Sequence, residues 1–170
     1  MGLLKKIGIG LSMVAAQVGL AESPTDDAAR LAKMESMYEG YRSEFEAVPE
    51  VTATELKGML EGGDIVLVDA RAEAERAVSI IPGAISKEAF DPKAAEGKVV
   101  VAYCTIGYRS GEWAEAQRAE GVDARNFRGS VLAWSHIGGP FVTPAGEPTN
   151  KVHVYGALWD LLRNDYTSVY

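Results

Sequence analysis

The sequence has very few of the residues that form disulfides and metal sites: one cysteine and two histidines among 170 residues. A single cysteine cannot form an internal disulfide, and this set falls short of the ligands of a structural zinc site. Basic residues are also outnumbered, with 17 Lys and Arg against 24 Asp and Glu and a formal net charge of −7. Because an acidic protein repels phosphate backbones, we expect no nucleic-acid partner. We also expect no metal and no organic cofactor.

Internal repeats are missing as well, which argues against a solenoid. Apolar residues make up 47% of the chain and charged residues 24%, the balance of a globular protein rather than of a disordered one. The length of 170 residues fits about one domain.

No apolar run reaches the roughly 20 residues that a membrane span requires. The longest uncharged run, residues 7–21, follows Lys5 and Lys6 and ends with small residues at Gly19 and Ala21, where a signal peptidase would cleave. Residues 1–21 are therefore predicted to be a signal peptide that exports the protein across the inner membrane to the periplasm. The alternative is an uncleaved membrane anchor. In an oxidising compartment an unpaired thiol is a hazard unless it is used.

Residues 22–48 are predicted to form one amphipathic helix. Pro24 suits a first turn, and apolar residues then recur at spacings of three and four until Pro49. The apolar stripe consists of Leu31, Met34, Tyr38, Tyr41, Phe45 and Val48. We expect this stripe to pack on the chain's own domain. The alternative is contact, through residues 25–47, with a second copy or with a partner protein.

Residues 49–170 alternate between short apolar runs and helical patterns. Such alternation predicts an α/β domain with a mostly parallel central sheet and helices on both faces. Residues 141–165 are expected to extend this domain with a C-terminal hairpin and a closing helix. The predicted strands cover residues 65–68, 99–103 and 122–127, and the predicted helices cover residues 54–60, 72–77, 110–120 and 130–137.

The reactive residue types gather around Cys104, which lies between a predicted strand and a helix expected to begin near Ser110. Ligands of open α/β sheets bind at such strand ends. Gly107 lets the intervening loop, residues 105–109, curl so that backbone N–H groups turn toward the sulfur. These groups, the helix N-terminus and Arg109 favour the thiolate, which is the nucleophilic form of cysteine. The simpler interpretation is that Cys104 is a small buried apolar residue.

The segment from Cys104 to Ser110 resembles the active-site loop of single-domain rhodanese-like sulfurtransferases. Residues 66–71, 81–85 and 126–134 resemble further signatures of this family, and all of them occur in the family's order.

Two positions depart from the family pattern. Val78 and Ser79 stand where the family usually has Gly-His, and Ser130 stands where it often has a second glycine. Neither position is the nucleophile, so we expect the fold and the loop to be kept. The first departure bears on how a substrate enters.

The resemblance implies a rhodanese fold and a sulfur-transfer cycle. Cys104 would take sulfane sulfur from a small anionic donor such as thiosulfate, become a persulfide, and pass the sulfur to a thiol or a cyanide-like acceptor. Arg109 would contact the donor or shape the loop by pairing with an acid. Asp69 and Arg71 are expected to form a supporting ion pair. The implied substrate-binding residues are Thr105, Ile106, Gly107, Tyr108, Arg109 and Ser110.

Two other functions stay open at this point. The first is a rhodanese-fold persulfide carrier or binding module without turnover. The second is a phosphatase or arsenate-reductase type of enzyme, whose loops are one residue longer than the four residues that separate Cys104 from Arg109 here. A cysteine protease is not expected, because His136 and His153 fit ordinary packing or surface positions.

Overall fold

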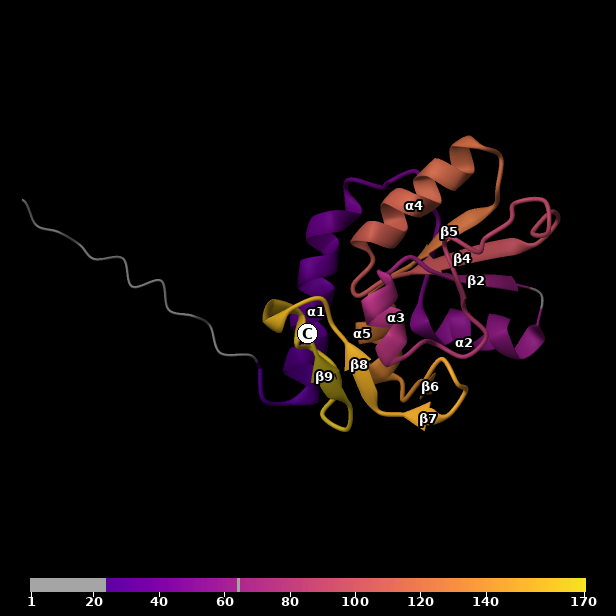
Figure 1. The fold of residues 1–170 in the computed structure, drawn as a ribbon. Coiled ribbons are helices and arrows are strands. Elements are labelled where there is room, and N and C mark those ends of the chain that lie inside the picture. The colour runs from indigo at the N-terminus through magenta and orange to yellow at the C-terminus, as the bar shows by residue number, and fades with distance from the viewer. Residues whose placement is uncertain (1–23, 64) are drawn as a thin grey trace, which may run out of the picture.

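The computed structural model describes residues 24–63 and 65–170, and the predicted leader, residues 1–21, lies outside them. Its centre is a parallel sheet of five strands in the order β1-β5-β4-β2-β3 (Figure 1). The strands are β1 (Glu50–Val51), β2 (Ile65–Asp69), β3 (Ile85–Ser86), β4 (Val99–Tyr103) and β5 (Ala124–Phe127). The expected α/β class with a mostly parallel sheet is confirmed.

Helices cover both faces of this sheet, because the side chains of each strand alternate between two apolar clusters. The helices are α1 (Asp27–Arg42), α2 (Ala53–Gly62), α3 (Glu73–Val78), α4 (Tyr108–Ala119) and α5 (Ser130–His136). Leu67 and Val101 pack into the cluster that holds α1, α2 and α5, whereas Val68 and Val100 pack toward α4. Among the helices that the structure describes, none is long and apolar enough to cross a membrane.

The leading helix is shorter than the predicted range of residues 22–48. It begins after the N-cap Asp26 and ends at Arg42, and successive turns then carry the chain to Val48. These turns bring the ring of Phe45 so close to α4 that a Cβ at Gly111 would lie 2.6 Å from it. Because α1 ends at Arg42 and turns follow it, the three-and-four spacing of Phe45 and Val48 reflects turns and not a helix. The stripe packs on the chain's own α4 and α5.

The C-terminal extension is built from short strands. The hairpin pairs β6 (Phe141–Val142) with β7 (Pro148–Thr149), and β8 (Lys151–His153) pairs in parallel with β9 (Thr167–Val169). The expected closing helix is wrong: the segment between β8 and β9 forms only the 3-10 turn η1 (Ala157–Trp159).

Residues 160–162, directly after the turn, are held by contacts with other elements. Leu161 and Leu162 are buried in the core, and the carbonyls of Asp160 and Leu162 both accept hydrogen bonds of 3.2 Å from Arg30 of α1. The extension is thereby held beside α1 and α3 (Figure 1).

Candidate active site

Cys104 lies at the carboxyl end of the central strand β4, between that strand and α4. The connection is tighter than expected, because α4 begins at Tyr108 rather than near Ser110. Tyr108 and Arg109 thus belong to the first helical turn, and the loop comprises only residues 104–107. The reason is the backbone of Gly107, whose φ of 120° turns the chain directly into the helix, a conformation open mainly to glycine.

Gly107 also contacts the sulfur directly: its backbone N–H donates a hydrogen bond to Cys104 Sγ over 3.2 Å. A Cβ at this position would lie 2.5 Å from the ring of Tyr38 in α1. Both the backbone angle and the lack of space therefore require glycine here. The predicted curl of the loop toward the sulfur is present at this amide.

Two buried polar residues, Ser110 and Asn126, form a hydrogen-bonded chain next to the loop. The hydroxyl of Ser110 lies 2.7 Å from Asn126 Oδ1 and 3.6 Å from Cys104 Sγ. Since a hydroxyl has one hydrogen, Ser110 donates to the nearer amide oxygen. Asn126 in turn donates to the carbonyl of Gly107 over 2.8 Å, so that β5 fixes the loop from below.

Ser130 is a site residue whose role the sequence did not disclose. Its hydroxyl accepts a 3.0 Å hydrogen bond from the backbone N–H of Cys104 and donates to the carbonyl of Phe127. Its φ of 47° is left-handed, a conformation that favours glycine, which is the residue common at this position in the resembled family. The hydroxyl thus ties the backbone of Cys104 to the start of α5.

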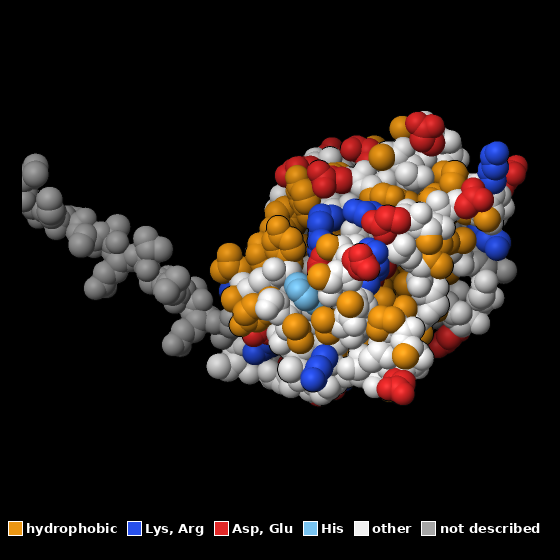
Figure 2. All heavy atoms as spheres, viewed as in Figure 1, with side chains coloured by type: hydrophobic (Ala, Val, Ile, Leu, Met, Phe, Trp, Pro, Cys, Tyr) orange, Lys and Arg blue, Asp and Glu red, His pale blue; other side chains and the backbone are white. Residues whose placement is uncertain are grey.

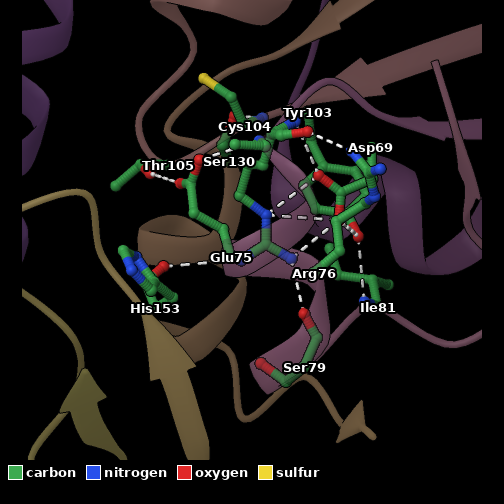
Figure 3. A network of polar contacts seen from close by, with 12 residues as sticks. Asp69, Glu75, Arg76, Ser79, Ile81, Tyr103, Cys104, Thr105, Ser130 and His153 are labelled. Carbon is green, nitrogen blue, oxygen red and sulfur yellow. Dashed lines mark hydrogen bonds and ion pairs between the residues drawn. The ribbon is translucent and has the colours of Figure 1, made fainter. Parts of the chain in front are cut away.

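Arg109 is paired with an acid rather than free. Its guanidinium makes two hydrogen bonds, of 2.6 and 2.8 Å, to the buried carboxylate of Glu75 in α3, and a third of 3.2 Å to Thr105 Oγ1 (Figure 3 shows Glu75 and Thr105). The alternative role that the sequence left open for Arg109, shaping the loop by an ion pair, is the one seen. Glu75 itself was missed, because nothing in its local pattern distinguishes it from other helical glutamates.

This ion pair shifts the pKa of both partners. Burial raises the pKa of Glu75, but the hydrogen bonds from Arg109 and from the backbone of Ala72 outweigh it and hold that pKa below its ordinary value. Burial lowers the pKa of Arg109, while Glu75 and the nearby Cys104 raise it, with a net rise. Both groups therefore stay charged at neutral pH.

Replacing Glu75 by glutamine is expected to lower the free energy of unfolding at pH 7 by about 1.5–3 kcal/mol, the range for hydrogen bonds to charged groups. A carboxylate with a depressed pKa stabilises the fold above its unfolded pKa of about 4.3 and loses that contribution as the pH falls through its folded pKa. The difference between the parent and Glu75→Gln should therefore shrink below about pH 4.3. Urea unfolding at pH 7 and pH 3 measures it, with the exposed Glu73→Gln as control. A difference equal at both pH values would contradict the ionic origin.

Asp69 and Arg71 form the supporting ion pair that was expected, and both are completely buried. Arg71 Nη2 lies 2.7 Å from Asp69 Oδ2 and donates over the same distance to the carbonyl of Ser79. Tyr103 donates to Asp69 over 2.6 Å and accepts from the N–H of Ile81 (Figure 3). Ser79 departs from the family pattern, but it contributes to this cluster through its backbone carbonyl.

The charges in this cluster are fixed by their partners. Burial alone would lower the pKa of Arg71, but the hydrogen bonds and charge of Asp69 raise it above its ordinary value. Burial and the charge of Asp69 also raise the pKa of Tyr103 well above its ordinary value. The cluster ties together the ends of β2 and β4, and it thereby supports the loop that follows β4.

The sulfur faces a pocket of about 380 Å³. In Figure 3 the side chain of Cys104 points away from the cluster around Asp69 and Tyr103. Cys104 is only 1% exposed, as the simpler interpretation of a buried residue expects, and it also lines this pocket. The other lining residues are Tyr41, Thr105, Ile106, Tyr108, Arg109, Tyr155 and Trp159.

The ring nitrogens of the two histidines bond to backbone groups of the C-terminal extension. His136 Nε2 lies 2.9 Å from the carbonyl of Leu161, and His153 Nδ1 accepts from the backbone of Tyr155. Within residues 24–63 and 65–170, no group of three His, Cys, Asp or Glu side chains could hold a metal ion.

Comparison with known proteins agrees with this geometry. Residues 52–137 match the rhodanese-like domain family. A sulfurtransferase from Allochromatium vinosum is 34% identical over 92 residues, which cover 49% of this chain and 83% of that protein.

Two solved structures show the same fold. A thiosulfate sulfurtransferase from Pseudomonas aeruginosa superposes with a TM-score of 0.51 at 21% identity, over 67% of this chain and only 23% of that protein. A protein from Bacillus halodurans superposes with a TM-score of 0.50 at 20% identity, over 65% of this chain and 87% of that protein.

Proposed function

Because this chain belongs to the rhodanese-like sulfurtransferase family, we propose that it moves sulfane sulfur from a donor such as thiosulfate to a thiophilic acceptor through a persulfide on Cys104. The observation that carries the proposal is the position of Cys104: the residue lines the pocket, and its sulfur accepts the N–H of Gly107. A nucleophile needs both access and a donor that stabilises its negative charge.

In the first half of the cycle, the thiolate of Cys104 attacks the outer sulfur of thiosulfate. A new sulfur–sulfur bond forms at Cys104, the bond within thiosulfate breaks, and sulfite leaves with its electron pair. Cys104 then carries an anionic persulfide. The amide of Gly107 and the positive N-terminal end of α4 stabilise that anion, as an oxyanion hole stabilises oxygen.

In the second half, the acceptor attacks the outer sulfur of the persulfide. With cyanide as acceptor, a carbon–sulfur bond forms, the sulfur–sulfur bond breaks, and Cys104 leaves as the thiolate while thiocyanate departs. No net oxidation or reduction of the protein occurs over the cycle. Ser130 and Asn126 keep the loop in place through both steps, since each holds a backbone atom of residues 104–107.

The test is an assay of the parent protein with thiosulfate and cyanide, in which both thiocyanate and sulfite are measured. Equal amounts of the two products, formed over many turnovers, are the expected result. A persulfide that forms once but does not turn over would support the carrier alternative. Hydrolysis of an aryl phosphate without thiocyanate formation would support the phosphatase alternative.

We also propose that the protein acts in the periplasm. The support is the sequence of residues 1–21, with its basic start and uncharged run. A thiol that cycles through a persulfide would be in use there rather than left unpaired in an oxidising compartment.

A further inference from the structure

Three aromatic side chains from outside the matched family region form walls of the pocket at Cys104. Tyr41 comes from α1, and Tyr155 and Trp159 come from the C-terminal extension, whereas the family match ends at residue 137. The rings of Tyr155 and Trp159 meet edge to face, with centroids 5.1 Å apart, and Tyr41 meets Tyr108 in the same way at 5.3 Å. The pocket at Cys104 is thus bordered by segments that lie outside the family match.

Tyr155 is held over the site at some conformational cost. Its φ of 54° is left-handed, which is rare for a bulky residue, and its ring lies 5.0 Å from the guanidinium of Arg109. The residue is nevertheless 60% exposed, so packing in the core does not explain its position. Backbone strain of this kind concentrates at functional sites.

The pocket does not offer a free positive charge to a small dianion. Arg109 alone is cationic among the described residues that line it, and its charge is paired with Glu75. Two acids outside the lining lie near the pocket residue Tyr108: its hydroxyl is 3.2 Å from Glu44, and the charges of Glu44 and Glu112 raise the pKa of Tyr108. A doubly charged donor such as thiosulfate therefore receives little electrostatic help on entry.

The pocket is also large and apolar for an inorganic ion. Its volume of about 380 Å³ falls within the range of about 300–1,000 Å³ that is typical of pockets for organic ligands. Figure 2 shows hydrophobic side chains gathered over α1 and the C-terminal segment. Tyr155 and Leu158 are exposed hydrophobic residues of that segment.

We propose that Tyr155 and Trp159 bind the organic part of the sulfur donor, and that the preferred donors are singly charged sulfane-sulfur compounds with an apolar group. This inference rests on the proposed function and specifies its substrate class. With an organic thiosulfonate, the thiolate of Cys104 bonds to the outer sulfur, the sulfur–sulfur bond of the donor breaks, and the sulfinate leaves with the electron pair. With an organic persulfide, the leaving group is the organic thiolate.

The experiment compares kcat/KM for benzenethiosulfonate and for thiosulfate, with cyanide as acceptor. We expect the parent protein to prefer benzenethiosulfonate. Trp159→Ala and Tyr155→Ala should each lower kcat/KM for benzenethiosulfonate by about tenfold and change that for thiosulfate by less than about twofold. Tyr170→Ala, which removes an exposed aromatic ring outside the pocket, is the matched control and should change neither value.

Three results would count against the inference. It is overturned if the parent prefers thiosulfate, or if the ratio of the two kcat/KM values is the same in both variants as in the parent. If neither donor passes sulfur to Cys104, the proposed function itself fails, and this inference fails with it.

Two further measurements serve as controls. Trp159→Phe, which keeps an aromatic ring, should retain most of the preference for benzenethiosulfonate. The melting temperature of each variant separates a lost contact from a lost fold.

Discussion

Cys104→Ser is expected to reduce sulfur transfer from thiosulfate to cyanide by at least about a thousandfold, the order of loss seen when a covalent nucleophile is removed. Serine lacks the thiolate that attacks the donor, and its hydroxyl is not ionised at neutral pH. The chain has no second cysteine that could take over the sulfur. Initial rates of thiocyanate formation at saturating donor measure the effect.

The fold should survive this substitution, which makes the loss interpretable. Serine is close to cysteine in size, and the backbone N–H of Cys104 keeps its bond to Ser130. We expect the melting temperature of Cys104→Ser to stay near that of the parent. A variant that stays folded and retains more than about a tenth of the parent rate would show that another group carries the sulfur, contrary to the proposed nucleophile.

Asp69→Ala is expected to lower the free energy of unfolding by about 3–5 kcal/mol, the cost of leaving a buried charge unpaired. The substitution removes the carboxylate that accepts from both Arg71 and Tyr103, and both partners are fully buried. Such a loss is a large part of the stability of a small domain, about 5–15 kcal/mol. Sulfur transfer should decrease in parallel, because the cluster holds the end of β4.

Urea unfolding measures this effect, and Glu61→Ala, at an exposed position of α2, is the matched control. The control should change the free energy of unfolding by less than about 0.5 kcal/mol. A cost below about 1 kcal/mol for Asp69→Ala would show that water reaches the pair and compensates its loss, which would contradict the complete burial of both side chains.

Much of the fold follows from local patterns. The run at residues 99–103 is apolar on both faces, so it predicts a strand that is covered on both sides, and β4 occupies the middle of the sheet. Gly107 and Arg109 marked the loop, because the chemistry of a cysteine anion needs close backbone approach and positive charge. Local patterns failed where turns imitate helical spacing, as at Phe45 and Val48.

The missing parts of the site depend on long-range contacts. Glu75 reaches Arg109 across 34 positions of sequence, and Ser130 reaches Cys104 across 26. Tyr155 and Trp159 belong to a segment of turns, where side-chain direction follows from the tertiary structure and not from a repeat. Only the folded chain shows that these residues gather at one end of β4.

The central claim is that Cys104 accepts one sulfur atom and holds it. The most direct measurement is the intact mass of the parent protein after incubation with thiosulfate in the absence of an acceptor, with peptide mapping to place the added mass. We predict a gain of one sulfur atom on the peptide that contains Cys104, its removal by cyanide, and no gain in Cys104→Ser. An unchanged mass in the parent, or a sulfur atom that also appears in Cys104→Ser, would contradict the account.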